Sequence, residues 1–167
     1  MLRLYGQESD RPPLAWSWVD QQLAAAGTYW VVAQGAAGHP QPRPVWGVWN
    51  RQQLHLSIGS PTLARALGER PAATVHLESG TDVVIVEGLV AVAVQTDPAT
   101  LEAYNRKYDW DYRVEQYGAL TRLSPSRVLA WRAAGWAGRE SFQQTGCWLF
   151  AEPARRIGGS PVAAPIQ

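Results

Sequence analysis

The segment SIGSPTLAR, residues 57–65, combines a helix start with groups that can hold an anion. Gly59 turns the chain after an apolar strand, Ser60 suits the N-cap position and Pro61 suits the first helical position. The free main-chain N–H groups of such a start, together with the helix dipole, attract anions such as phosphate. Arg65, one turn further on, could add a guanidinium. An ordinary capped helix that binds nothing fits the same residues, so the segment predicts a helix and leaves the anion site open.

The motif VWGVW, which begins at Val45, would place large flat side chains and a bare stretch of main chain on one strand. Side chains alternate along a strand, so Val45, Gly47 and Trp49 share one face. Trp46 and Val48 share the other. Because Gly47 lacks a side chain, a flat ring could lie against the main chain there, within reach of its N–H and C=O groups. A glycine packed beneath a tryptophan in the core explains the motif equally well, and the residues leave both interpretations open.

The segment TDVVIVEGLVAVAV, residues 81–94, carries a carboxylate in an otherwise apolar strand. A buried carboxylate must be paired, protonated or turned outward. Gly88 follows Glu87 directly, and a glycine inside a strand often marks a bulge or a sharp bend. We expect a bulge in which Glu87 bonds an arginine or a main-chain amide, in preference to a catalytic acid.

The remaining acids and the histidines form no metal or catalytic cluster in the sequence. Asp109 and Asp111 are neighbours, but no histidine or third carboxylate accompanies them at ligand spacing, which favours a solvated loop. His39, His55 and His76 are expected on a turn and two strands, without the spacing of paired ligands. Nucleophile elbows, phosphate-binding loops and dinucleotide-binding glycine patterns are also absent from the sequence. The sequence predicts neither a catalytic residue nor a metal site, and any catalysis would depend on a bound cofactor.

Composition argues against several classes of protein. The net charge is +1, from 15 basic and 14 acidic residues without a block of one sign, which argues against binding to nucleic acid or to a membrane surface. Cys147 is the single cysteine, so an intrachain disulfide is impossible and a reducing compartment is expected. The sequence shows neither a signal peptide nor an apolar run long enough for a membrane span. These features predict a cytoplasmic protein.

Periodicity and turn signals predict the elements that would carry these residues. Alternating apolar residues between glycine- and proline-rich turns indicate a mainly β protein, a β-barrel with added helices. One domain is expected over residues 14–150, between an N-terminal arm of residues 1–13 and a disordered tail of residues 151–167. The expected helices are 14–26, 59–71 and 98–108, and the expected strands are 28–34, 42–50, 53–58, 73–77, 82–94, 119–123, 128–132 and 147–150, with 119–123 and 128–132 paired across Ser124, Pro125 and Ser126.

The order and spacing of six segments resemble one known family. The segments are TYWVVAQ, GHPQPRPVWGVW, LHLSIGSPTLARAL, VHLESGTDVVIVEG, AYNRKY and RVLAW, all within residues 14–150. This succession resembles the pyridoxamine 5′-phosphate oxidase-like split barrels, and among them the flavin/deazaflavin oxidoreductase branch. The resemblance implies a six-stranded FMN-binding split barrel that forms a homodimer. Each dimer would bind two isoalloxazine-type cofactors in clefts built from both subunits.

The resemblance also implies a cofactor site. The ring would lie along the strand at residues 45–47, and the phosphate would lie near the helix start described above. Relatives often carry a lysine where Thr62 and Leu63 stand here, and an asparagine where Ala66 stands. The phosphate would then rely on hydroxyls, main-chain amides and Arg65. The implied cofactor-binding residues are Val45, Trp46, Gly47, Ser57, Ile58, Gly59, Ser60, Thr62, Leu63 and Arg65.

The expected function is that of a homodimeric oxidoreductase that uses FMN or the deazaflavin coenzyme F-420. It would transfer a hydride between the reduced cofactor and an unsaturated small-molecule substrate. The alternative is a non-catalytic module that binds a flavin, haem or similar flat ligand on the same barrel, because one fold can host many functions. At the level of the sequence both interpretations stay open, and so does a third, a scaffold that has lost the cofactor.

Overall fold

The computed structural model of the chain describes residues 12–35, 37–92, 94–134 and 142–150. The expected tail, and all but the end of the expected N-terminal arm, lie outside the described residues. The described elements are α1 (Trp16–Ala25), β1 (Tyr29–Gln34), β2 (Pro40–Asn50), β3 (Gln53–Ser57), α2 (Pro61–Glu69), β4 (Ala72–His76), β5 (Asp82–Ala91), α3 (Pro98–Tyr108), α4 (Val114–Tyr117), β6 (Thr121–Ala133) and β7 (Phe142–Leu149).

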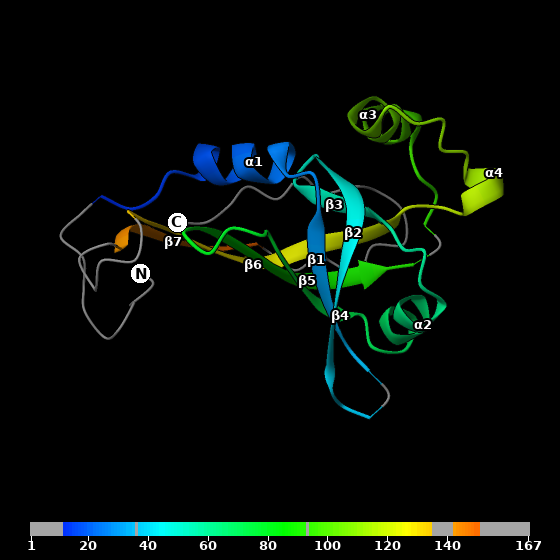
Figure 1. The fold of residues 1–167 in the computed structure, drawn as a ribbon, viewed down its shortest axis with the longest axis horizontal. Coiled ribbons are helices and arrows are strands. Elements are labelled where there is room, and N and C mark those ends of the chain that lie inside the picture. The colour runs from blue at the N-terminus through cyan, green and yellow to red at the C-terminus, as the bar shows by residue number, and fades with distance from the viewer. Residues whose placement is uncertain (1–11, 36, 93, 135–141, 151–167) are drawn as a thin grey trace.

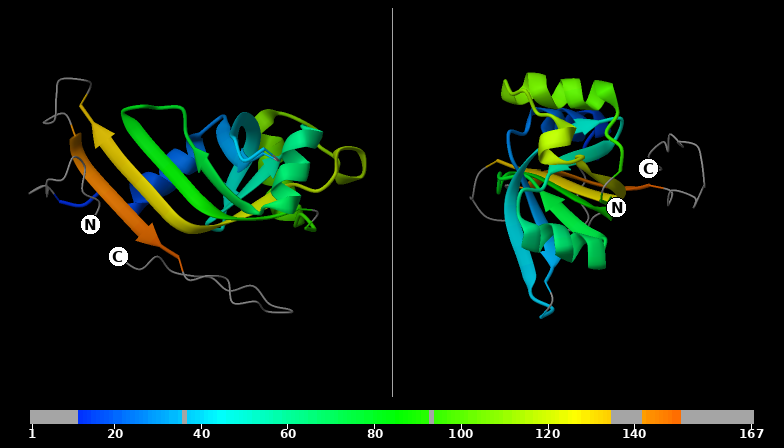
Figure 2. Two further views of the ribbon diagram at one scale, coloured as in Figure 1. Left: turned by 90° about the horizontal axis from the view of Figure 1, so that it is seen from below. Right: turned by 90° about the vertical axis from the view of Figure 1, so that its right-hand side faces the viewer.

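Six of these strands close into an antiparallel barrel. Their order is β3-β2-β1-β4-β5-β6, and β3 also pairs with β6, which closes the ring. β5 pairs with β6 along one edge, and β7 pairs with residues 127–133 on the opposite edge, beyond the residues 121–123 that pair with β3. In two perpendicular views, α1 and α3 lie on one side of the barrel and α2 lies on the other (Figure 1, Figure 2). The prediction of a mainly β fold, a six-stranded barrel with added helices, is confirmed.

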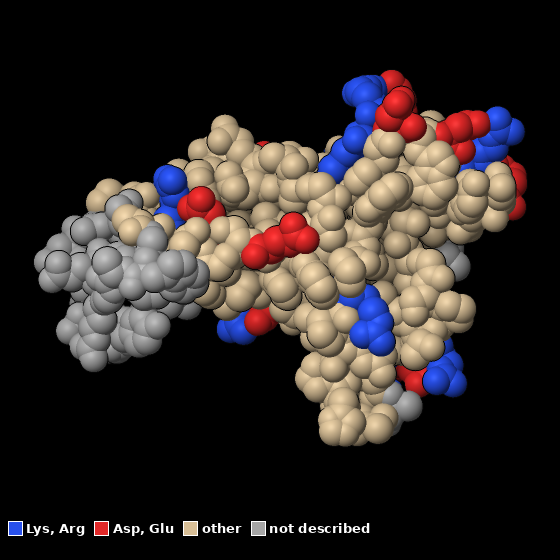
Figure 3. All heavy atoms as spheres, viewed as in Figure 1, with Lys and Arg blue, Asp and Glu red and all other residues tan. Residues whose placement is uncertain are grey.

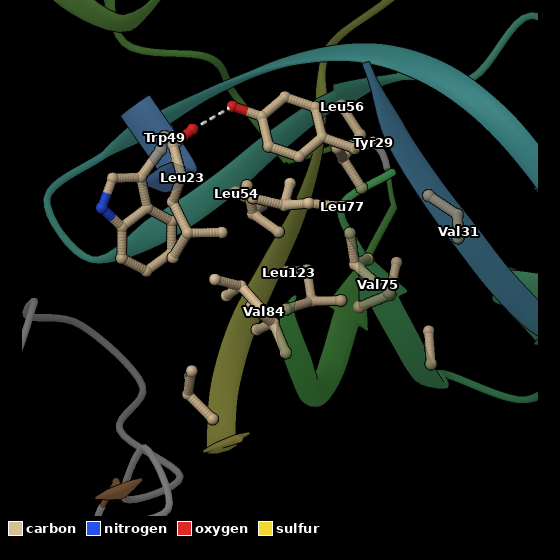
Figure 4. Packing of buried hydrophobic residues seen from close by; sticks show 14 of the residues in the cluster. Leu23, Tyr29, Val31, Trp49, Leu54, Leu56, Val75, Leu77, Val84 and Leu123 are labelled. Atoms are coloured by element: carbon tan, nitrogen blue, oxygen red, sulfur yellow. Dashed lines mark hydrogen bonds between the residues drawn. The ribbon is translucent and has the colours of Figure 1, made fainter. Parts of the chain in front are cut away.

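The alternating apolar residues of the strands fill the barrel. In β1, Tyr29, Val31 and Ala33 are buried, whereas the residues between them are half-buried. The Tyr29 hydroxyl donates to the main-chain oxygen of Leu23 at 2.6 Å, which ties α1 to the barrel (Figure 4). Each fully buried aliphatic side chain contributes about 1.5–3 kcal/mol to the free energy of unfolding. Further fully buried residues of this core are Leu54, Leu56, Val75, Val84 and Leu123.

The predicted hairpin around Pro125 is wrong, because β6 runs unbroken through this segment. Glu87 of β5 pairs with Arg127 of β6. The next residue, Gly88, pairs with Pro125 and not with Ser126, which is therefore the extra residue of a β-bulge. Proline and serine are typical of turns, but here the bulge accommodates the proline, which has no N–H to donate to the sheet.

The bulge confirms the structural interpretation of Glu87. Its carboxylate accepts a hydrogen bond from Nε of Arg127 at 2.7 Å, and the two side chains form an ion pair. A Cβ atom on Gly88 would lie 2.2 Å from the main-chain oxygen of Ser124, so a side chain does not fit there. Glu87 therefore holds two strands together.

Two further elements differ from the sequence prediction. β7 begins five residues before the strand predicted at 147–150, because its polar first half is held by pairing with β6 and not by an apolar pattern of its own. The single turn of α4 is not predicted, since four residues are too few to show helical periodicity.

The surface shows mixed charges. In Figure 3, acidic and basic side chains lie next to each other over α3 and α4, without a broad area of one sign on that face. Arg106 pairs with Glu102 there, and Arg113 pairs with Asp111. Among the described residues, no helix has the length and apolar character needed to cross a membrane.

Candidate functional site

A pocket of about 400 Å³ lies where β2, the start of α2 and the region around the end of α3 meet. Its wall is largely apolar and aromatic, and one arginine supplies the charge among the lining residues. The lining residues are Arg43, Pro44, Val45, Trp46, Ser57, Gly59, Ser60, Leu63, Tyr104 and Trp110.

The pocket exists because β3 accompanies β2 over only part of its length. β2 pairs with β1 over residues 40–45 and with β3 over residues 46–50. β3 ends at Ser57, opposite Trp46, and the chain then turns into α2. Residues 40–45 of β2 therefore have an edge that β3 does not cover, and the pocket lies beside it. Main-chain groups at such an edge are free to bond a ligand.

The region around the end of α3 supplies an aromatic wall. Trp46 stacks on Tyr108, with ring centroids 4.7 Å apart and planes inclined by 3°. Trp110 meets Trp46 edge-on, with centroids 5.8 Å apart. Trp46 is nevertheless 48% exposed. A large, partly exposed ring of this kind is suited to a flat aromatic ligand.

Tyr104 adds a hydroxyl that the fold does not satisfy. Its side chain is fully buried, and the hydroxyl has no hydrogen-bond partner among the described residues. Burial raises the pKa of Tyr104 to about 12; the Ser57 hydroxyl opposes part of that rise, although no hydrogen bond of ordinary geometry joins them. Tyr104 therefore keeps its proton at neutral pH and is a hydrogen-bond donor at the pocket.

The start of α2 forms as the sequence predicts. Ser60 is the N-cap, and its hydroxyl accepts a hydrogen bond from the N–H of Leu63 at 3.4 Å. Both residues line the pocket. Arg65 does not line it and instead pairs with Glu69 one turn along the helix, at 4.0 Å. The arginine that lines the pocket is Arg43 of β2. An anion site at the start of α2 stays a prediction, and Arg43 takes the place of Arg65 in it.

Gly47 is not among the residues that line the pocket. A Cβ atom on it would lie 2.7 Å from Cδ2 of Leu56 and 2.8 Å from the main-chain oxygen of His55. Its N–H donates to the Tyr108 hydroxyl at 2.9 Å, and its carbonyl oxygen accepts from Tyr108 at 2.8 Å and from Lys107 at 2.9 Å. Of the two interpretations of VWGVW, the contacts of Gly47 match a packing glycine, although its nearest side chains are Leu56 and Tyr29 and not the expected tryptophan. A ring was expected to bond the main-chain groups of Gly47, but the N–H and C=O groups of this residue are already bonded to Tyr108 and Lys107.

Lys107, the single lysine of the sequence, ties α3 to the barrel. Its ammonium donates to the Tyr29 hydroxyl at 3.0 Å and to the carbonyl of Gly47. It also lies 4.7 Å from the centroid of the Tyr29 ring and 5.3 Å from that of Tyr108. Burial lowers the pKa of Lys107 to about 8. In the described part of the chain no carboxylate pairs with it, so aromatic faces and neutral oxygens hold the charge.

The histidines lie outside the pocket lining. His55 is buried on β3, and burial lowers its pKa to about 4. His76 stacks on Trp30, with centroids 6.2 Å apart, and its Nδ1 lies 2.9 Å from the main-chain oxygen of the next residue. His39 is exposed. As the sequence predicts, His39 lies between two strands and His55 and His76 lie on strands.

The two aspartates after α3 have local roles. Asp109 ends the helix in the left-handed conformation, with φ of 48°. Asp111 accepts hydrogen bonds from Arg113. Among the described residues there is no group of three or more side chains that could hold a metal ion.

The structure brings together six of the ten predicted cofactor residues. Those that line the pocket are Val45, Trp46, Ser57, Gly59, Ser60 and Leu63, and those that do not are Gly47, Ile58, Thr62 and Arg65. Four further lining residues were not predicted from the sequence: Arg43, Pro44, Tyr104 and Trp110. A signal for one of them was present, because Tyr104 and Tyr108 stand four residues apart in AYNRKY and so share a helix face.

Comparison with known proteins identifies the fold. No family model and no curated protein matches the sequence. Among solved structures, a Clostridium acetobutylicum protein related to general stress protein 26 of B. subtilis, of the pyridoxinephosphate oxidase family, has a TM-score of 0.56 at 10% identity, over 80% of this chain and 92% of that chain. An F-420 reductase has a TM-score of 0.52 at 18% identity, over 65% of this chain and 94% of that chain. The chain has the split-barrel fold.

The split barrel confirms the fold that the sequence resemblance implies. A haem-binding protein from Mycobacterium smegmatis shares it, with a TM-score of 0.56 at 18% identity, over 78% of this chain and 56% of that chain. Identities this low establish the fold alone. Because split barrels serve proteins with different ligands, the function of this chain has to be argued from its own pocket.

Proposed function

We propose that this split barrel is a flavin- or deazaflavin-dependent oxidoreductase that holds its cofactor in the pocket beside β2. The composition of the pocket carries the proposal. Aromatic rings line one wall, a capped helix start and Arg43 supply positive potential, and no carboxylate is among the lining residues. A flat ring with a phosphate tail matches that combination. The F-420 reductase among the similar structures supports the same class of ligand.

The Tyr104 hydroxyl, which has no partner among the described residues, shows whether the pocket suits these cofactors. A buried hydroxyl without a partner costs about 1–3 kcal/mol of folding free energy, so such a group is a natural place for a ligand acceptor. The ring systems of FMN and of F-420 both carry carbonyl oxygens, which can accept this hydrogen bond. In the first turn of α2, Pro61 has no N–H and the N–H groups of Leu63 and Ala64 are bonded to Ser60, so the phosphate would rely on Arg43 and on the N–H of Thr62, between the lining residues Ser60 and Leu63. The residues present therefore fit either cofactor.

When bound, the reduced cofactor supplies the hydride. The chain's own residues would bind and orient the ring: Trp46, which Trp110 meets edge-on, would offer a stacking face, and the Tyr104 hydroxyl would donate a hydrogen bond. None of the lining side chains is a carboxylate, a histidine or a lysine, so the wall described here holds no group that titrates near neutral pH. We propose that the proton that completes the reduction comes from solvent.

A second copy of the chain would complete the cleft. Trp46 is 48% exposed and Trp110 is 37% exposed, so the aromatic wall is open on one side in the single chain. Large exposed rings beside a pocket are typical of a surface that a partner covers. We propose a homodimer, which light scattering of the purified protein over a range of concentrations would detect. A monomer at all concentrations would contradict it.

A binding module without turnover is the second candidate. The same contacts would hold a flavin whether or not a substrate follows. Haem is matched less well, because none of the lining residues is histidine, cysteine or methionine. The raised pKa of Tyr104 also opposes its ionisation to a haem-binding tyrosinate.

Titration and turnover together test the proposal. FMN and F-420 are first titrated into the protein, and the reduced form of the cofactor that binds is then mixed with a panel of unsaturated acceptors. Cofactor oxidation that requires both the protein and an acceptor supports the oxidoreductase. Tight binding without oxidation across the panel supports the binding module. Absence of binding by both cofactors would contradict both.

A further inference from the structure

The two hairpins of β2 fix the direction of its main-chain groups. In the β1–β2 hairpin, the N–H of Gly35 donates to the carbonyl of His39 at 2.9 Å. Hydrogen-bonded pairs recur at every second residue, so the odd-numbered residues of β2 turn their N–H and C=O groups to β1. In the β2–β3 hairpin, Asn50 pairs with Gln53 across a two-residue turn, so the even-numbered residues face β3. Both hairpins therefore place the N–H and C=O groups of the even-numbered residues of β2 on the edge away from β1.

The even-numbered residues at the uncovered edge of β2 are all prolines. They are Pro40, Pro42 and Pro44. Proline has no N–H, so this edge presents carbonyl oxygens without any N–H donor. The carbonyl of Pro42 already accepts a hydrogen bond from the side chain of Arg43 at 2.8 Å. Pro44 lines the pocket, and no described side chain donates to its carbonyl.

The other polar groups of the pocket are mainly donors. The Arg43 guanidinium donates and cannot accept, and the Tyr104 hydroxyl has no partner for its proton. The hydroxyls of Ser57 and Ser60 can do either. No carboxylate is among the described residues that line the pocket. For a ligand that carries an N–H group, the main-chain carbonyl of Pro44 is therefore the acceptor at the uncovered edge of β2, and it differs from the two serine hydroxyls in that it can only accept.

We propose that the Pro44 carbonyl selects the ligand by accepting a hydrogen bond from a ring N–H, so that the pocket takes heterocycles with an imide N–H at one edge. This inference rests on the proposed function, because the rings of FMN and of F-420 both carry an imide N–H between two carbonyl groups. A ring that turned only carbonyl oxygens toward β2 would place acceptors against acceptors. The prolines of β2 thus determine which edge of the ring faces the strand.

A pair of ligands tests the selection. Dissociation constants are measured for FMN and for FMN methylated at the imide nitrogen, by quenching of flavin fluorescence. Loss of a hydrogen bond that leaves a buried acceptor unpaired weakens binding about tenfold or more, so the methylated ligand should bind at least that much more weakly. Equal dissociation constants would overturn the inference.

A pair of variants separates the hydrogen bond from the bulk of the methyl group. Pro44→Ala adds an N–H donor beside the pocket, which can bond a carbonyl of the methylated ring, so the ratio of the two dissociation constants should fall several-fold. Pro42→Ala adds the same N–H at a residue that does not line the pocket, and the ratio should stay at the wild-type value. Circular dichroism confirms that each variant is folded. A ratio that Pro44→Ala leaves unchanged would show that the methyl group merely clashes.

The outcomes distinguish this inference from the proposed function. If neither FMN nor F-420 binds to the wild-type protein, the proposed function fails and the selection has no ligand to act on. If FMN binds and its methylated form binds equally well, the proposed function stands and the role of Pro44 is wrong.

Discussion

Two aromatic clusters share strand β2 and differ in what their rings do. The inner cluster surrounds α1 and consists of Trp16, Trp49, Trp148 and Phe150, with ring centroids 5.4–6.5 Å apart in the contacting pairs. The outer cluster lies beside the pocket and consists of Trp46, Tyr104, Tyr108 and Trp110. β2 contributes one tryptophan to each cluster, three residues apart.

The contrast between these two tryptophans follows from strand alternation. Trp49 is 8% exposed, and its indole N–H donates to the carboxylate of Asp20 at 2.7 Å. Trp46 points from the opposite face and is 48% exposed. A buried ring with its polar atom satisfied stabilises the fold. A ring that the fold leaves half open contributes less to stability and is available to a ligand.

The largest expected effect is on stability, at Trp49. Trp49→Ala removes a buried ring and leaves Asp20 without its donor, so the free energy of unfolding should fall by about 3–5 kcal/mol. Trp46→Ala, the matched substitution in the outer cluster, should cost about 1 kcal/mol or less. Urea denaturation of the two variants measures both values. Similar losses at the two positions would break the distinction between the clusters.

Gly47, between the two tryptophans, should show the next largest effect. The clash of a Cβ atom with Leu56 and with the main chain of His55 means that Gly47→Ala should lose about 1–3 kcal/mol of stability. Gly59 has no atom within 4 Å of its Cβ position, so Gly59→Ala should change stability little. Thermal unfolding of both variants checks the prediction. A stable Gly47→Ala protein would restore the alternative in which this glycine serves a ligand.

The third effect concerns affinity in the outer cluster. Trp46→Ala should weaken FMN binding about tenfold, because a stacked aromatic pair contributes about 0.5–1.5 kcal/mol beyond its buried area. Trp30 also stacks on a ring, that of His76, but does not line the pocket, so Trp30→Ala should leave the affinity unchanged. Calorimetric titration compares the two. Equal weakening would indicate a general effect on the barrel.

The smallest expected effect is the pH dependence that Lys107 gives to the anchor between α3 and β2. Its pKa is lowered to about 8 in the folded chain from an ordinary value of 10.5. Between these values the unfolded chain binds more protons, so stability should rise with pH. The pKa values of Tyr104 and Tyr108 are raised above 10.0, so their opposing contribution begins only above that pH.

The control for this effect is Lys107→Met, measured by urea denaturation from pH 7.5 to about pH 9.5, the window set by the lowered pKa. The rise in stability with pH should disappear in the variant. A rise of the same size in both proteins would assign it to another group.

Local signals in the sequence predicted the parts of the site that depend on local structure. The cap of α2 followed from Ser60 and a proline at the first helical position, and the structure shows both. The bulge followed from a carboxylate and Gly88 inside an apolar strand. The hairpin expected at Pro125 was wrong because the same turn-forming residues also fit a bulge, and the pairing with β5 decides between them.

The remaining parts depend on which segments meet in the barrel. Tyr104 and Trp110 reach the pocket only because α3 packs beside β2; the spacing of Tyr104 and Tyr108 predicts that they share a helix face but not which strand that face meets. The two interpretations of Gly47 differ in what lies against its open face, and Leu56 comes from the neighbouring strand. Arg43, and not the predicted Arg65, lines the pocket because the pairing of β3 with β2 ends at Trp46, which leaves the part of β2 that carries Arg43 uncovered.

Titration of FMN into matched arginine variants tests the central claim most directly. Arg43 lines the pocket, whereas Arg127 is paired with Glu87 at the bulge and does not line it. Saturable binding by the wild-type protein, weakened about tenfold in Arg43→Gln and unchanged in Arg127→Gln, is the predicted result, since a charge-assisted hydrogen bond is lost in the first variant alone. Equal affinity of the wild-type protein and Arg43→Gln for FMN would contradict a cofactor site in this pocket. Absence of saturable binding of both FMN and F-420 would contradict it as well.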